Sequence, residues 1–185
     1  MIYVFTDGSS SRKYNTIGFG VLICKSEDCI ILSRGIGLKD SSLTGAAELL
    51  GILTALSLLL ENNLEKEDII LYCDSQYALN ECTKYLKDHL QQRYVNIKNS
   101  DIIINIIYRL QFFKNLKFEW VKGHQIKDNF DSWGNNIVDK LAVESHKSEE
   151  IRDNLFSFKD IIEDIKKENK ENKYLDKNFN FYLYK

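Results

Sequence analysis

Short apolar runs separated by turn residues open this chain and predict three strands. The runs occupy residues 2–7, 17–25 and 29–37, and the polar segment 26–28 joins the second run to the third. Gly8 follows the first run and interrupts its apolar pattern. We therefore expect a strand followed by a hairpin.

Helical periodicity dominates the rest of the chain and is interrupted by two more strand-like runs. Apolar residues one turn apart predict helices over 44–62, 75–90, 100–113 and 135–146, while strands are predicted over 69–74 and 116–121 and an irregular loop over 123–134. Ser41, Ser42 and Thr44 are all suitable N-caps for the first helix. This order of elements predicts an α/β fold in which helices cover a mixed sheet.

Composition is consistent with one globular domain and an appendage. The 185 residues are 44% hydrophobic and 28% charged, which suits a packed core. No apolar stretch approaches the roughly 20 residues of a membrane span, and the N-terminal residues lack the features of a signal peptide. These features lead us to expect an intracellular, cytoplasmic protein that is not attached to a membrane.

The net charge and the cysteine content exclude few functions. The formal net charge is −2, so any nucleic-acid binding must depend on local patches or on a bound cation. The four cysteines, Cys24, Cys29, Cys73 and Cys82, show no C-x-x-C spacing. We expect them to be reduced and mostly buried.

Two predicted strands end on an aspartate. Asp7 is the last residue of the first run and Asp74 the last residue of the run over 69–74, and open α/β sheets bind ligands outside the carboxyl ends of their strands. Two neighbouring carboxylates are unfavourable unless a cation or a shared proton compensates them. Each residue also has a simpler interpretation, because Asp7 suits an Asp-Gly turn and Asp74 suits a helix cap.

Two further acidic residues occur within predicted helices. Glu48 lies in a first turn among alanines and leucines, where it either belongs to a site or interacts with the helix dipole. Asp139 is either a site residue or an ordinary exposed acid near Lys140 and Lys147. Taken alone, each of the four acidic residues is weak evidence for a site, but the four together favour a metal site.

Five motifs, taken in order, resemble those of cellular, type 1 ribonuclease H. They are Thr6-Asp7-Gly8-Ser9, Ala47-Glu48-Leu49, Cys73-Asp74-Ser75-Gln76-Tyr77-Ala78, Trp120-Val121-Lys122-Gly123-His124 and Asn135-Asn136-Ile137-Val138-Asp139-Lys140-Leu141-Ala142. The resemblance covers residues 1–147 and implies a ribonuclease H-like fold, with a five-stranded mixed sheet flanked by helices. It also implies an endonuclease that cuts the RNA strand of RNA–DNA hybrids and leaves 5′-phosphomonoesters. Residues 148–185 form a C-terminal extension outside it.

The resemblance assigns a role to each acidic residue. It implies that Asp7, Glu48, Asp74 and Asp139 hold two Mg²⁺ ions, for which Mn²⁺ is a possible substitute. Asp7 would bridge both ions, Asp139 would hold the nucleophile-side ion, and Glu48 with Asp74 would hold the leaving-group-side ion. Hard cations prefer such oxygen ligands, and ions about 4 Å apart activate water and stabilise a departing oxygen.

A histidine and several polar residues complete the implied site. The resemblance makes His124 a loop histidine that assists proton transfer or product release, whereas the alternative is an ordinary solvent-exposed histidine. The candidate substrate contacts are Gly8, Ser9, Thr44, Gly45, Gln76 and Asn135 on the RNA side and Asn99 at a DNA phosphate. Such contacts read the 2′-hydroxyl, which separates RNA from DNA.

The chain departs from its apparent relatives in one segment. Many type 1 members carry a protrusion rich in tryptophan and lysine, but residues 84–98 have no tryptophan. The basic residues there are Lys84, Lys87, Arg93 and Lys98, and Tyr94 is available for stacking. The segment is either a hybrid-binding handle or a solvated helix end. We expect weaker and more salt-sensitive binding than a fully basic handle would give.

The C-terminal extension and the alternative functions stay open. Apolar residues from Phe156 to Ile165 predict an amphipathic helix, and an aromatic stretch ends the chain. The tail either packs back on the domain, self-associates, or docks on a partner by strand addition. We favour packing on the domain and expect a monomeric protein.

Two alternative functions stay open. They are a catalytically silent hybrid-binding module and another nuclease of the same broad fold.

Overall fold

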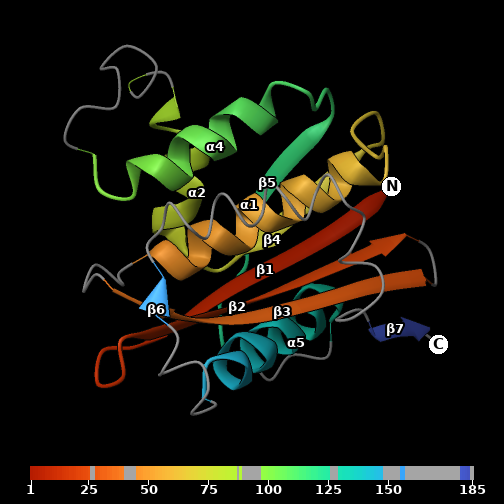
Figure 1. The fold of residues 1–185 in the computed structure, drawn as a ribbon. Helices are drawn as coiled ribbons and strands as arrows, with labels where there is room; N and C mark the ends of the chain where they lie inside the picture. Colours follow the sequence, from red (N-terminus) through yellow and green to blue (C-terminus); the bar gives the residue numbers. More distant parts are fainter. Residues whose placement is uncertain are drawn as a thin grey trace.

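A mixed β-sheet with helices on both faces forms the molecule (Figure 1). The computed structural model describes residues 1–25, 28–39, 45–86, 88, 97–125, 129–147, 155–156 and 180–183. The strands are β1 (Ile2–Ser11), β2 (Thr16–Lys25), β3 (Asp28–Leu38), β4 (Ile69–Cys73), β5 (Leu116–Trp120), β6 (Leu155–Phe156) and β7 (Asn180–Leu183). The helices are α1 (Ala46–Glu61), α2 (Gln76–Cys82), α4 (Ser100–Leu110) and α5 (Phe130–Ser145).

The strand order confirms the expected mixed sheet. β1, β2 and β3 are antiparallel neighbours, whereas β4 and β5 run parallel to β1. The order is β5-β4-β1-β2-β3-β6, and β7 also pairs with β3. β4 ends beside the middle of β1, because Cys73 pairs with Thr6, and this places Asp7 next to Asp74. The expectation that the first strand ends at Asp7 was wrong, since β1 continues to Ser11 through its pairing with β2.

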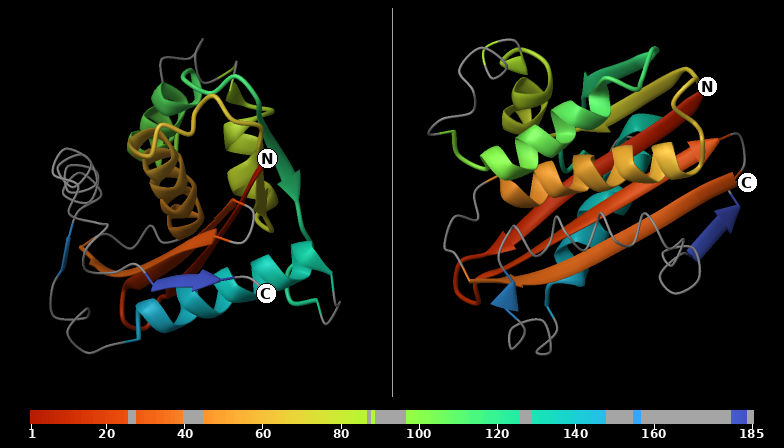
Figure 2. Two further views of the ribbon diagram at one scale, coloured as in Figure 1. Left: turned by 90° about the vertical axis from the view of Figure 1, so that its right-hand side faces the viewer. Right: turned by 45° about the horizontal axis from the view of Figure 1, so that its top comes forward.

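The two faces of the sheet have different covers (Figure 2). α1, α2 and α4 lie on one face and α5 lies on the other. α1 is buried almost all round because the sheet covers one side of it and α4 covers another. On the opposite face, Phe130 and Trp133 of α5 pack with Phe5 of β1. These two layers hold α1 and α5 on either side of β1.

Glycines allow α5 to approach the sheet closely. A Cβ on Gly20 would lie 2.5 Å from the Val138 carbonyl oxygen, and one on Gly134 would lie 2.5 Å from the Phe5 ring. A Cβ on Gly18 would collide with the Ala142 carbonyl oxygen. The helix is therefore seated directly against β1 and β2.

Some predicted boundaries were wrong. α5 begins at Phe130 rather than 135, because Asn129 Oδ1 accepts a hydrogen bond from the Ser132 backbone N at 2.9 Å and caps the helix. α2 ends at Cys82, well before 90. Leu155–Phe156 is a strand, so the predicted tail helix does not include Phe156.

Strand pairing also corrects one prediction about the cysteines. The hairpin places Cys24 of β2 directly opposite Cys29 of β3, and the two form a disulfide. Cys73 and Cys82 are reduced and buried, as expected. A spacing of five residues along the chain does not reveal that two cysteines become neighbours across a hairpin.

Two short segments of the C-terminal tail join the sheet. β6 pairs in parallel with Gly37–Leu38, and β7 pairs antiparallel with residues 28–31. The expectation that the tail packs on the domain is confirmed for these two segments. Residues 157–179, like Lys87, Arg93 and Tyr94 of the proposed handle, lie outside the described residues. Within the described part of the chain, no helix has the length and apolarity needed to cross a membrane.

Candidate active site

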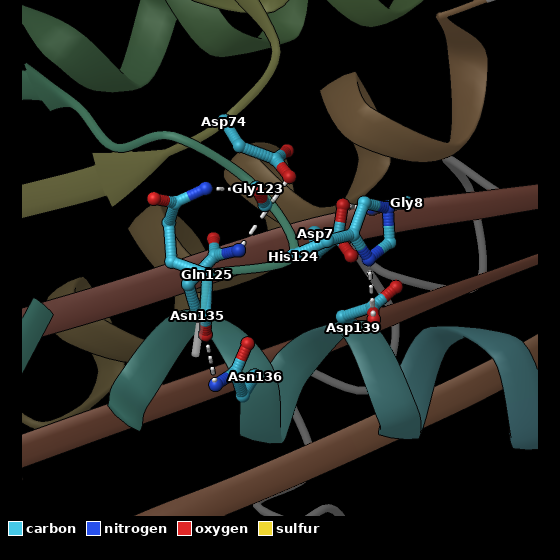
Figure 3. A network of polar contacts seen from close by, with 9 residues as sticks. All are labelled: Asp7, Gly8, Asp74, Gly123, His124, Gln125, Asn135, Asn136 and Asp139. Carbon is cyan, nitrogen blue, oxygen red and sulfur yellow. Dashed lines mark hydrogen bonds and ion pairs between the residues drawn. The ribbon is translucent and has the colours of Figure 1, made fainter. Parts of the chain in front are cut away.

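Four separate elements bring the four acidic residues together. Asp7 lies in β1, and Asp74 follows β4, whose last residue pairs with Thr6. Glu48 lies in the first turn of α1 on one face of the sheet, and Asp139 lies on α5 on the other face. Figure 3 shows the side chains of Asp7, Asp74 and Asp139 directed toward a common space.

Gly8 allows α1 to bring Glu48 close to β1. A Cβ on Gly8 would lie 2.6 Å from the Ala47 carbonyl carbon and 2.8 Å from the Glu48 Cα. The Gly8 backbone N also donates to Asp7 Oδ1 at 2.8 Å. Gly8 therefore orients the Asp7 carboxylate and leaves room for the helix that carries Glu48.

The electrostatics of the site are those of crowded carboxylates. Asp7 is 5% exposed, and burial, followed by the charges of Asp74 and Asp139, raises its pKa to about 8. The pKa of Glu48 is raised well above its usual range by burial and then by Asp7 and Asp74. The charges that raise both pKa values belong to other carboxylates, so a bound cation would relieve the repulsion.

The donor set suits a hard divalent cation. Ligand atoms of Glu48, Cys73 and Asp74 lie within 4.8 Å of one another, and Asp7 is electrostatically coupled to Glu48 and Asp74. Burial raises the pKa of the Cys73 thiol well above its usual range, so Cys73 stays protonated and is a poor ligand. The remaining donors are carboxylate oxygens, which fit Mg²⁺.

His124 lies at the edge of this cluster. Its Nδ1 is 3.4 Å from Asp139 Oδ2, and 81% of its side chain is exposed. Its backbone adopts a left-handed conformation with φ 53°, in the loop between β5 and α5. His124 is therefore both solvent-exposed and beside the acidic site (Figure 3).

Asn135 and the loop before α5 surround Asp74. Asn135 is 1% exposed, and its Nδ2 lies 3.5 Å from Asp74 Oδ2; its Oδ1 has no hydrogen-bond partner among the described residues. A Cβ on Gly123 would collide with Asp74 Oδ2. Trp120 Nε1 donates to the Asp74 carbonyl oxygen at 2.9 Å. Asn135 is thus placed against a proposed ligand.

Hydrogen bonds connect the His124 loop to α5. Gln125 Nε2 donates to the Gly123 carbonyl oxygen at 3.3 Å, and Asn136 Nδ2 donates to the Gln125 carbonyl oxygen at 3.1 Å. Sequence reasoning did not single out Trp120, Gly123 or Asn136 as site residues. The sequence feature that could have identified them is that they belong to two of the five motifs.

Tyr77 links two proposed substrate contacts. Gly45, with φ +77°, precedes α1, and a Cβ there would collide with the Tyr77 ring. The Tyr77 hydroxyl accepts a hydrogen bond from Asn99 Nδ2 at 3.0 Å. Gly45 and Asn99 therefore lie on either side of Tyr77, which sequence reasoning also missed.

The other proposed contacts are dispersed. Gln76 is exposed at the start of α2, and Ser9 lies on β1 two residues beyond Asp7. Thr44 lies outside the described residues. The structure thus brings the four predicted metal ligands and His124 together and places Asn135 at Asp74, whereas Gln76, Gly45 and Asn99 lie along the neighbouring helix starts.

Comparisons with known proteins agree on one family. The family model "RNase H" matches residues 1–147. The ribonuclease H of Haemophilus influenzae strain 86-028NP is 29% identical over 157 residues, which cover 82% of this chain and 94% of the relative. The ribonuclease H of Desulforamulus reducens is 31% identical over 152 residues, which cover 79% of this chain and 87% of the relative.

Solved structures agree on the fold. The prototype foamy virus protease–reverse transcriptase superimposes with a TM-score of 0.65 at 21% identity, over 80% of this chain and 21% of that one. The foamy viral enzyme has also been solved in complex with an RNA/DNA hybrid. Since the family model covers most of the chain, this protein belongs to the RNase H family.

Proposed function

We propose that this protein is an endonuclease that hydrolyses the RNA strand of RNA–DNA hybrids with the help of Mg²⁺. The observation that carries the proposal is the convergence of Asp7, Glu48, Asp74 and Asp139 from four elements onto one space. A scaffold or silent binding module has no need for carboxylates that raise one another's pKa values. Membership of the RNase H family supports the same activity.

The four carboxylates would divide the binding of two metal ions. When bound, the ions supply an activated water and stabilise the departing 3′-oxygen. Asp7 is the most buried of the four and lies between Asp74 and Asp139, which suits it to contact both ions. Asp139 would bind on the nucleophile side, and Glu48 with Asp74 on the leaving-group side. Mn²⁺ has the same preference for oxygen donors and would substitute.

His124 would handle protons during turnover. Its ring is exposed to solvent and its Nδ1 lies 3.4 Å from Asp139 Oδ2. It would therefore exchange a proton between the site and bulk water, or help the product to leave. Because the departing group would be the 3′-oxygen, hydrolysis would leave a 5′-phosphomonoester on the RNA product.

The hybrid would be recognised by polar groups around the acidic cluster. Gly8, Ser9, Thr44, Gly45, Gln76 and Asn135 are the proposed contacts to the RNA strand, and Asn99 the proposed contact to a DNA phosphate. Asn135 supports this assignment because its Nδ2 lies 3.5 Å from Asp74 Oδ2, next to the acidic cluster. The 2′-hydroxyl is the group that such contacts must read.

The domain limits and cellular context belong to the same proposal. Residues 1–147 would form the catalytic domain and 148–185 an extension, in a monomeric protein whose tail could also contact a partner. We place its activity in the cytoplasm. The Cys24–Cys29 disulfide does not favour this compartment, since disulfides are rare in cytosolic proteins.

A substrate panel tests the proposal. Labelled RNA–DNA hybrid, double-stranded RNA and duplex DNA are incubated with Mg²⁺ and either the wild-type protein or Asp7→Asn. The proposal predicts cleavage of the hybrid's RNA strand by the wild type alone. Absence of hybrid-specific cleavage, or full cleavage by the variant, contradicts it. Removal of single terminal nucleotides would favour an exonuclease of the same broad fold.

A further inference from the structure

His146, the residue at which α5 ends, joins that helix to two strands. Its Nδ1 lies 3.1 Å from the Thr16 Oγ1 on β2, and its Nε2 lies 3.1 Å from the Ser9 Oγ on β1. A neutral imidazole has one N–H and one lone pair, so one hydroxyl accepts from the ring and the other donates to it. His146 is only 6% exposed and Thr16 is fully buried, so water competes little for the bond between them.

The neighbouring residue extends this attachment to a third strand. Ser145 Oγ donates to the Arg34 carbonyl oxygen on β3 at 3.1 Å. Gly18 on β2 leaves space for both side chains, since a Cβ there would lie 2.9 Å from the His146 Cδ2. The end of α5 is therefore hydrogen-bonded to β1, β2 and β3, the strands that it crosses in Figure 2.

His146 and Asp139 lie on the same side of α5. They are seven residues apart, which is close to two helical turns. Asp7 and Ser9 are two residues apart on β1 and face the same side of the sheet. Beyond the aromatic packing at Phe5, α5 and β1 therefore have two polar contacts along one line, first at Asp7 with Asp139 and then at Ser9 with His146.

The two meeting points have opposite effects on the packing of α5. The contact between Asp7 and Asp139 brings two carboxylates together, and their repulsion contributes to the raised pKa of Asp7. The contact between Ser9 and His146 is a partly buried hydrogen bond that holds the helix and the strand together. When Asp7 and Asp139 are both ionised and no cation is bound, this hydrogen bond opposes the separation that their repulsion favours.

We propose that His146 is a positioning residue for the acidic site, holding Asp139 beside Asp7 through its hydrogen bond to Ser9 so that both carboxylates bind one divalent cation. This inference rests on the proposed function, because it concerns the same site. His146 does not touch the reacting atoms. Its effect is on the affinity of the site for the ion.

The test measures Mn²⁺ binding to the full chain by titration calorimetry without nucleic acid. His146→Ala and Ser9→Ala each remove the bond between β1 and α5, so each is expected to weaken Mn²⁺ binding by about three- to tenfold. The double variant should bind no more weakly than His146→Ala, which already lacks the bond to Ser9. His146→Gln places an amide near the position of Nε2 and should recover most of the affinity, whereas His146→Asn should not.

A matched control separates positioning from general stability. Ser57→Ala removes another buried side-chain hydrogen bond, from Arg109 Nε at 2.8 Å, between α1 and α4. It should lower the unfolding temperature without changing the Mn²⁺ dissociation constant. Equal weakening of Mn²⁺ binding by Ser57→Ala and His146→Ala would overturn the inference.

Other outcomes are also decisive. Wild-type Mn²⁺ affinity in both His146→Ala and Ser9→Ala overturns the inference and leaves the proposed function standing. If His146→Ala does not fold, Ser9→Ala, which loses a single hydroxyl, answers the same question. Failure of the wild-type protein to bind Mn²⁺ overturns the proposed function and the inference together.

Discussion

Gly8 lies against the first turn of α1, where an added Cβ would come within 2.8 Å of the Glu48 Cα. The backbone of a helix cannot yield as a flexible side chain does. Any side chain at this position therefore moves α1 away from β1, and Glu48 moves with it. The distance between Glu48 and the other carboxylates thus depends on the absence of a side chain at residue 8.

Gly8→Ala is expected to reduce hybrid cleavage by about 100-fold, since a displacement near 1 Å is costly in a site that needs aligned groups. Steady-state cleavage of a labelled hybrid measures the loss. Gly51→Ala is the matched control, because its Cβ would lie 3.5 Å from the Asp7 carbonyl oxygen, an ordinary contact. Similar activity in the two variants would contradict this account of Gly8.

The metal-free protein is expected to lose stability as the pH rises from about 4 to about 8. The pKa of Asp7 is about 8 in the folded state and near 3.9 in an unfolded chain. Between these two pH values the folded state binds more protons than the unfolded state. The free energy of unfolding therefore decreases as the pH rises. Asp7→Asn should remove much of this slope and gain on the order of 2–4 kcal/mol at pH 8. Urea titrations of the wild type and Asp7→Asn at pH 5 and pH 8, with a chelator present, measure the free energy of unfolding of each protein. An equal change in this free energy between the two pH values in both proteins would contradict the prediction.

Metal binding should release protons for the same reason. The cation needs an ionised Asp7, whose pKa is about 8 without it, so binding near pH 7 must displace a proton. Calorimetric titrations with Mg²⁺ in two buffers of different ionisation enthalpy would report this release. We expect weaker binding at pH 6 than at pH 8, and a binding constant that does not change with pH would be evidence against the site.

The sequence predicted the sheet and most helices because β1 to β5, α1 and α4 carry unbroken apolar patterns. It also singled out the four carboxylates that the structure brings together, since each lies in a recognisable motif. α5 was predicted to start five residues late because Phe130 and Trp133 continue the helix through a polar segment and pack on Phe5. Periodicity alone does not reveal that aromatic packing.

Relationships that depend on register were not visible in the sequence. Cys24 and Cys29 become partners only through the pairing of β2 with β3. Tyr77 meets Gly45 only once α1 and α2 are packed. His146 is a lone histidine in the sequence, and its two hydroxyl partners lie 130 and 137 residues away.

Tyr77→Phe tests the surface beside the acidic cluster. The variant keeps the ring against Gly45 but loses the hydrogen bond that Asn99 Nδ2 donates at 3.0 Å. If Asn99 contacts the DNA strand, KM for a hybrid should rise about two- to fivefold while kcat stays unchanged, since one neutral hydrogen bond is lost. Steady-state kinetics of hybrid cleavage at two salt concentrations measure KM and kcat. A loss confined to kcat would place Tyr77 in the chemical step instead.

The central claim is that Asp7, Glu48, Asp74 and Asp139 bind the cations that cleave the RNA strand of a hybrid. Its most direct test is a crystal structure of Asp139→Asn with a short RNA–DNA hybrid and Mn²⁺, in which anomalous scattering locates the metal. We expect Mn²⁺ beside Asp7, Glu48 and Asp74, facing a phosphate of the uncut RNA strand. Mn²⁺ bound away from these carboxylates, or a hybrid seated on another face of the sheet, would contradict it.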